Sequence, residues 1–147
     1  MRNGGAVVDR IRVTDAAALL GVSDDTLRRW GDSGRIEVDR SAGPATVGGA
    51  ELAALATQIA NESPLARLLP AEGTSSARNR VTGIVTRVLR DGVMAQVELQ
   101  AGPFRFVSLM SREAADELRL EPGAVATASV KATTVVIEHA DPRREVR

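Results

Sequence analysis

The apolar residues follow two different periods along the chain, and the period changes once. In the first part they recur every three or four positions, as in Leu52, Leu55 and Ile59, which predicts helices with one buried face. From Val81 onward, β-branched residues alternate with polar ones, which predicts strands. We therefore predict a two-domain α + β fold: one domain over residues 1–63, a Pro-, Gly- and Ser-containing linker over 64–75, a second domain over 76–139 and a tail over 140–147.

Two short helices are predicted at the start of the first domain. Thr14 is placed to cap the first helix and Gly21 to end it, and Ser23 is placed to cap a second helix over residues 24–33. A short strand over 35–38 and a glycine-rich, wing-like loop follow, before the helix that contains Leu52. The pattern is that of a winged helix-turn-helix.

The second helix carries the residues that would contact DNA. Its apolar side contains Leu27 and Trp30, which we assign to the core, while its arginines project elsewhere and have the geometry to pair with guanine edges or phosphates. The alternative is that these arginines form an ordinary solvated face. The motif reads Val13-Thr14-Asp15-Ala16-Ala17, Leu20-Gly21-Val22-Ser23, Thr26-Leu27-Arg28-Arg29-Trp30 and Gly34-Arg35-Ile36. It resembles the DNA-reading head of the MerR family, which implies double-stranded DNA as a partner and contacts from Thr26, Arg28, Arg29, Arg35 and Arg40.

Composition limits the possible chemistry. The net charge is zero, from 19 basic and 19 acidic residues, which does not indicate a protein that coats nucleic acid or another polyanion non-specifically. There is no cysteine, which excludes thiolate nucleophiles and Cys-ligated metals. The one histidine, His139, is interpreted as an exposed tail residue, which disfavours a zinc site or a His-based catalytic site, and no enzyme is predicted. The first nine residues lack the apolar segment of a signal peptide, and no stretch is long enough for a membrane span, so we expect a cytoplasmic protein.

The second domain is predicted to be a small β-barrel. Asp91-Gly92 separates two β-rich runs and predicts a hairpin turn. Further strands are predicted over 104–109, 125–131 and 133–138, with a short helix capped by Ser111 and reaching Leu118. The expected architecture is an OB-like barrel of about five strands with one short helix.

Both ends of this domain are rich in hydrogen-bond donors. It begins with Ser76-Ala77-Arg78-Asn79 and ends with Lys131-Ala132-Thr133, and neither segment contains a carboxylate. If the ends meet, their hydroxyls, N–H groups and cations suit a small oxyanion, to which Ser111 at a helix start would add another hydroxyl. The alternative is a set of ordinary linker and strand-edge residues.

A second resemblance specifies the anion. The residues that carry it are Ser76-Ala77-Arg78-Asn79, Val81, Gly83, Val85, Gly92, Ala95, Val97, Leu118, Leu120, Gly123 and Val130-Lys131-Ala132-Thr133-x-Val135. They look like the Mop, or molbindin, domain of the TOBE group, which implies molybdate or tungstate bound at a subunit interface of a homo-oligomer, a dimer or a larger assembly such as a hexamer. Carried over by position, the ligands are Ser76, Ala77, Arg78, Asn79, Lys131, Ala132 and Thr133, with Ser111 as a further candidate; Ala132 stands where some members have serine.

Together the two resemblances imply a molybdate-responsive transcriptional regulator that binds DNA. The alternative is a molybdate-binding or storage protein without a regulatory role. Residues 1–60 contain 7 basic and 8 acidic residues, and this low local charge favours the alternative, because DNA binding requires local positive potential. The intact motif around Trp30 favours the regulator.

Overall fold

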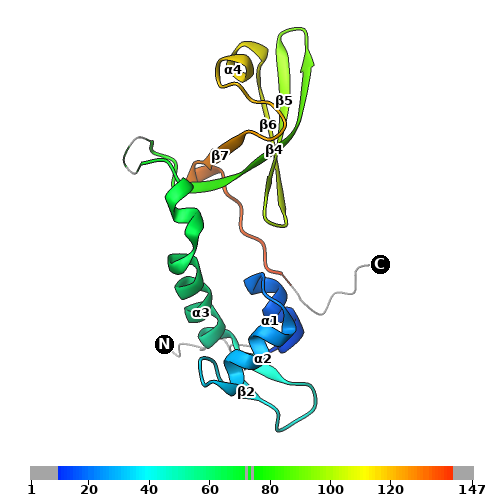
Figure 1. Cartoon of the computed structure of the whole chain (residues 1–147), viewed down its shortest axis with the longest axis vertical. Coiled ribbons are helices and arrows are strands. Elements are labelled where there is room, and N and C mark those ends of the chain that lie inside the picture. Colours follow the sequence, from blue (N-terminus) through cyan, green and yellow to red (C-terminus); the bar gives the residue numbers. More distant parts are fainter. Residues whose placement is uncertain (1–9, 72, 74, 141–147) are drawn as a thin grey trace, which may run out of the picture. The chain divides into compact units, whose positions relative to one another are not determined.

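The computed structural model describes residues 10–71, 73 and 75–140 (Figure 1). The expectations for the first nine residues and for the tail beyond residue 140 therefore lie outside the described part. The chain divides into two compact units, one ending at Ser63 and the other spanning Pro64–His139, and each is described by itself.

The first unit combines three helices with a small antiparallel sheet. Its elements are β1 (Arg10–Arg12), α1 (Val13–Leu20), α2 (Asp24–Asp32), β2 (Val38–Asp39), β3 (Thr46–Gly48) and α3 (Gly49–Glu62). The strand order is β1-β3-β2, with Ile11 and Val38 both opposite Val47. The sequence pattern did not indicate β1, and the strand expected over residues 35–38 is confined to Val38–Asp39.

Local hydrogen bonds explain where the first two helices begin and end. The Ser23 hydroxyl accepts the Thr26 N–H at 3.1 Å, so the predicted cap of α2 is confirmed. The predicted cap of α1 is wrong: Thr14 lies inside the helix, and Arg12 holds the cap position without a side-chain bond, because Arg12 belongs to β1 and the chain passes directly from strand to helix. Gly21 ends α1 with φ of 70°, a conformation that glycine adopts without strain.

The core of the first unit is formed by the apolar faces of its helices and sheet. Leu27 and Val47 are fully buried, and Trp30 packs against the core, as its position beside Leu27 predicts. Helix α2 lies so close to β2 that a Cβ on Gly31 would collide with the side chain of Val38. The buried residues of this core are Val13, Ala16, Ala17, Leu27, Ile36, Val47, Leu52 and Leu55.

The second unit is a curled antiparallel sheet with one helix. After a 3-10 turn (Pro64–Leu68), the elements are β4 (Asn79–Asp91), β5 (Met94–Ala101), β6 (Phe104–Ser111), α4 (Arg112–Glu117), β7 (Val125–Val130) and a 3-10 turn (Ala132–Thr134). The strand order is β6-β5-β4-β7 (Figure 1). Strand β4 pairs with β7 through its first half and with β5 through its second. The β4–β5 register shifts between Val85 and Arg87, close to the point where β4 changes partner.

Two expectations for this unit are wrong. The hairpin turn is centred on Gly92-Val93, one residue later than Asp91-Gly92, because Asp91 pairs directly with Met94. The strand expected over 133–138 is not formed among the described residues: 132–134 make a 3-10 turn, and Val136 and Ile137 are more than four-fifths exposed. The described sheet thus has four strands rather than five, since an apolar β-branched run forms a strand only where a neighbouring edge pairs with it.

The inner face of the curled sheet is apolar. Val85, Val97, Leu99 and Leu120 form its buried cluster. Beside this cluster lies a groove of about 500 Å³, lined by side chains that include Phe106 and Met110 of β6 and Ala126 and Ala128 of β7. Because β6 and β7 are the two edge strands, the groove lies between unpaired edges.

Candidate functional site

The pairing of β4 with β7 brings the two donor-rich segments together. Asn79 stands opposite Val130 in the register, and its side-chain Nδ2 donates to the Val130 carbonyl at 3.2 Å. Residues 76–78 precede Asn79 and residues 131–133 follow Val130, so in an antiparallel pair they leave the sheet side by side. The ends of the domain therefore meet within one chain.

Local hydrogen bonds fix the shape of each segment. The Ser75 hydroxyl accepts the Ala77 N–H at 3.1 Å, and the Ser75 carbonyl accepts from Nη1 of Arg78 at 3.3 Å. On the other segment, the Lys131 carbonyl accepts both the N–H and the hydroxyl of Thr134, at 3.0 and 2.9 Å. Both segments are thus held as turns at the end of the sheet.

The charge at this place is positive and open to solvent. Among the described residues, no carboxylate lies within 4 Å of the Arg78 guanidinium or the Lys131 ammonium. Ala77 is half-buried, whereas Ser76, Arg78, Asn79, Lys131, Ala132 and Thr133 are exposed. Such an arrangement of donors and cations offers an anion many hydrogen bonds and little electrostatic opposition.

Ser111 lies elsewhere in the sheet. It pairs with Met94 beside the β4–β5 turn, whereas Asn79 begins β4 at the opposite end of that strand. Its hydroxyl accepts the Ala114 N–H at 3.1 Å and caps α4, as the sequence predicts. Within one chain, Ser111 is therefore not brought to the other predicted anion ligands.

Arg80 lies close to the two donor-rich segments but was missed by the sequence reasoning. It stands on β4 opposite Ser129, two residues after Arg78, which precedes the paired stretch on the side of Lys131. A third cation is therefore present at the end of the sheet where these segments leave it. Its position two residues after Arg78 was the signal in the sequence that would have found it.

The predicted DNA-contacting residues of the first unit fall into two groups. Arg28 and Arg29 are exposed on α2, and Nη2 of Arg29 donates to the hydroxyl of the half-buried Thr26 at 3.3 Å. Arg35 instead lies 4.5 Å from the centre of the Trp30 ring and 3.4 Å from the Glu62 carboxylate. Arg40 is paired with Asp32 at 3.2 Å. The last two arginines thus already have intramolecular partners.

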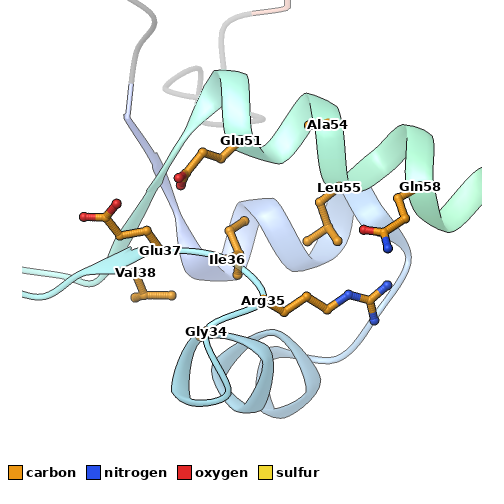
Figure 2. A pocket seen from close by; sticks show the side chains of 10 residues that line it. Gly34, Arg35, Ile36, Glu37, Val38, Glu51, Ala54, Leu55 and Gln58 are labelled. Atoms are coloured by element: carbon orange, nitrogen blue, oxygen red, sulfur yellow. The ribbon is translucent and has the colours of Figure 1, made fainter.

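A surface pocket of about 630 Å³ lies beside α3 in the first unit (Figure 2). Figure 2 shows Ile36 and Leu55 pointing toward one another, with Arg35 extending toward Gln58 and the Glu51 carboxylate on the other side. The lining mixes both signs of charge with apolar side chains, so it does not select one class of ligand.

Two kinds of feature are absent from the described residues. No group of three or more His, Cys, Asp or Glu side chains is arranged to hold a metal ion within residues 10–71, 73 and 75–140. In the same part of the chain, no helix is long and apolar enough to cross a membrane.

Comparisons with known proteins concern the second unit. Residues 75–137 match the TOBE domain model. A molybdate-binding protein from Sporomusa ovata is 27% identical, covering 46% of this chain and all of its own, with a TM-score of 0.44. MopII from Clostridium pasteurianum, in an apo form, is 36% identical, covering 45% of this chain and all of its own, with a TM-score of 0.42.

A third solved structure is the molybdate-bound cytoplasmic molybdate-binding protein ModG, which is 39% identical over 42% of this chain, with a TM-score of 0.40. The match covers 44% of the ModG chain. No curated protein sequence matches this chain. The match to the domain model therefore assigns residues 75–137 of this chain to the TOBE domain family.

Proposed function

We propose that this chain is a molybdate-responsive, DNA-binding transcriptional regulator whose TOBE domain binds molybdate or tungstate at a subunit interface. The observation that carries the oxyanion part is the pairing of Asn79 with Val130, which sets residues 76–78 beside residues 131–133. The similar protein from Sporomusa ovata and the protein ModG are both molybdate-binding by name, which supports the same ligand here.

The chemistry of the two segments suits a tetrahedral dianion. Lys131 supplies a compact point charge and Arg78 a planar guanidinium, while Ser76 and Thr133 supply hydroxyl donors. The side-chain amide of Asn79 and the backbone N–H groups of Ala77 and Ala132 are the other predicted ligands; in the present arrangement the Asn79 amide is bonded to Val130 and the Ala77 N–H to Ser75. The anion's oxygens accept from all sides, so a site of donors without carboxylates favours it.

A second copy of the chain would bury this open site. The ligand residues are largely exposed, and hydrogen bonds to an anion strengthen when water is excluded. Val136 and Ile137 are exposed, and an apolar groove lies open between β6 and β7, so the domain has apolar surface that association would cover. Sedimentation analysis of Ile137→Lys against Glu138→Lys tests this point: the former is expected to dissociate the oligomer, and equal masses would contradict the proposed interface.

The DNA-reading role is assigned to α2. Arg28 and Arg29 are exposed on a short helix capped by Ser23, the geometry by which a recognition helix presents side chains to the major groove. A homo-oligomer held by the TOBE domain would present these helices in pairs to two half-sites. Molybdate would then act by favouring one spacing of the heads.

A storage or buffering protein is the second candidate, and one observation favours it. Arg35 and Arg40, two of the predicted DNA contacts, are paired with Glu62 and Asp32. These carboxylates reduce the local positive potential that DNA binding requires.

Calorimetric titration with molybdate, tungstate, sulfate and phosphate tests the oxyanion proposal. Saturable heat is expected for molybdate or tungstate, with Lys131→Gln binding at least about tenfold more weakly because a charged hydrogen bond is lost. His139→Gln is the matched control and is expected to bind like the unaltered protein. Equal, weak heats for all four anions would refute the assignment.

Retention of a random-sequence duplex DNA library at fixed salt separates the two functions. The regulator is expected to retain DNA, and the Arg28→Ala, Arg29→Ala double variant to lose most of that retention. The Arg112→Ala, Arg119→Ala double variant removes the same charge from the TOBE domain and is the control. An absence of DNA retention by the unaltered chain, with and without molybdate, would favour the storage protein.

A further inference from the structure

Three cationic residues lie near one another in the register at the end of the β4–β7 pair. Arg80 stands opposite Ser129, Arg78 precedes Arg80 by two residues, and Lys131 follows Val130 at the end of β7. Within the described residues, no carboxylate lies within 4 Å of any of the three. Among those residues, their mutual repulsion is therefore not balanced by an ion pair.

Arg80 differs from the other two because it holds the connecting segment. Its Nη1 donates to the carbonyls of Pro70 and Ala71 at 3.2 and 3.3 Å. Those residues belong to the stretch that leads from the first unit, which ends at Ser63, into the TOBE domain. A strand that carries the candidate oxyanion site is thus fastened by one side chain to the segment preceding the domain.

The described neighbours satisfy the charge and the hydrogen-bond donors of Arg80 only in part. The acceptors are neutral carbonyls rather than a carboxylate, and Arg80 itself is half-buried. Its Nε is buried, and no described residue accepts a hydrogen bond from it. A buried donor without a partner is unfavourable, especially on a charged group. The described acceptors thus leave the Arg80 guanidinium only partly satisfied.

We propose that Arg80 is a positioning residue that couples occupancy of the oxyanion site to the order of the connecting segment. This inference rests on the proposed oxyanion site. A dianion bound between Arg78 and Lys131 neutralises the positive charge at this end of the sheet, which lowers the repulsion on Arg80 and stabilises its bonds to Pro70 and Ala71. Without the dianion, repulsion favours a guanidinium that turns into solvent and releases the segment.

Because such a coupling is reciprocal, a chain in which the connecting segment is held in place binds the oxyanion more tightly. The segment joins the TOBE domain to the proposed DNA-reading unit, so its order is the property through which the anion would influence the heads.

Hydrogen exchange measured by mass spectrometry on the full chain tests the coupling. Peptides covering residues 64–76 are compared in sodium molybdate and in sodium chloride at equal ionic strength. In the unaltered protein, molybdate is expected to slow exchange there by about two- to fivefold, the range for a partly exposed charge interaction. In Arg80→Gln, which keeps a hydrogen-bond donor but not the charge, the effect of molybdate is expected to vanish.

Two further variants separate coupling from a merely structural role. Arg80→Lys keeps the charge and is expected to retain part of the molybdate effect, whereas Arg119→Gln removes one charge from the same domain and is expected to behave like the unaltered protein. Calorimetry on each variant verifies that molybdate still binds.

The outcomes distinguish this inference from the proposed function. If the unaltered chain shows no molybdate heat, the oxyanion proposal fails and the coupling fails with it. If molybdate binds but exchange over 64–76 does not change, the coupling is overturned while the oxyanion site stands. A molybdate effect of equal size in Arg80→Gln also overturns the role of Arg80.

Discussion

The Asn79 side chain donates to the main-chain carbonyl of Val130, at 3.2 Å, at the point where β4 and β7 begin to separate. This bond adds a side-chain link to the last register position before the two donor-rich segments. The geometry of the candidate oxyanion site thus depends on a contact between residues 51 positions apart in the sequence.

We predict that Asn79→Ala weakens molybdate binding by about two- to tenfold, because one hydrogen bond that holds the segments together is lost. Titration calorimetry measures the change. Asn61→Ala, an exposed amide on α3, is the control. Unchanged affinity in Asn79→Ala would show that backbone pairing alone positions the site.

Arg35→Met is expected to lower the thermal stability of the first unit, whereas DNA retention by the folded protein is expected to change little. The guanidinium contacts the Trp30 ring and the Glu62 carboxylate, so its removal affects contacts within the unit. Thermal unfolding and DNA retention are measured on the same preparations, with Arg28→Met as the control for an exposed arginine. A normal melting temperature combined with lost DNA retention would restore Arg35 to the DNA-contacting set.

Glu98→Gln is expected to lower stability at neutral pH but not in acid. The hydrogen bond from Arg105, aided by the charge of Arg87, holds the pKa of the Glu98 carboxyl below its ordinary value. A carboxyl with a lowered pKa in the folded state stabilises that state above its unfolded pKa, and this contribution is lost as the pH falls through the folded value.

The difference in denaturant midpoint between Glu98→Gln and the unaltered chain should therefore be largest near pH 7 and shrink below about pH 4, near the ordinary pKa of a glutamate. Glu113→Gln, an exposed residue on α4 for which no ion pair within 4 Å is present in the described part of the chain, serves as the control. A difference that does not vary with pH would contradict the role of the Glu98 charge.

Gly83→Ala is expected to destabilise the TOBE domain by about 1–3 kcal/mol, as overpacking at a rigid position does. A Cβ at Gly83 would collide with the carbonyl of Gln100 on the adjacent strand, and backbone atoms cannot move aside independently. Gly73→Ala, where no atom lies within 4 Å of the added Cβ, tests strain from positive φ alone. Denaturant unfolding measures both, and equal stability of Gly83→Ala and the unaltered chain would refute the predicted clash.

Local sequence signals identified most of the elements but missed β1, predicted a strand over 133–138 that is not formed among the described residues, and did not fix the exact edges. Ser23 and Ser111 cap helices as predicted, because a hydroxyl before a helix satisfies its own chain's free N–H groups. The hairpin formed one residue later than expected, since the pairing of Asp91 with Met94 depends on the register of the whole β4–β5 ladder.

The sequence by itself determined which residues carry donors and cations, and it determined that a helical part precedes a β-rich part, because periodicity and residue chemistry are local properties. Only the tertiary structure decided their neighbours. The β4–β7 register joined Asn79 to Val130, the β5–β6 register left Ser111 at the other end of the sheet, and packing brought Arg35 to Glu62. The physical reason is that such contacts join residues distant in sequence, and strand register and burial of the whole domain fix them together.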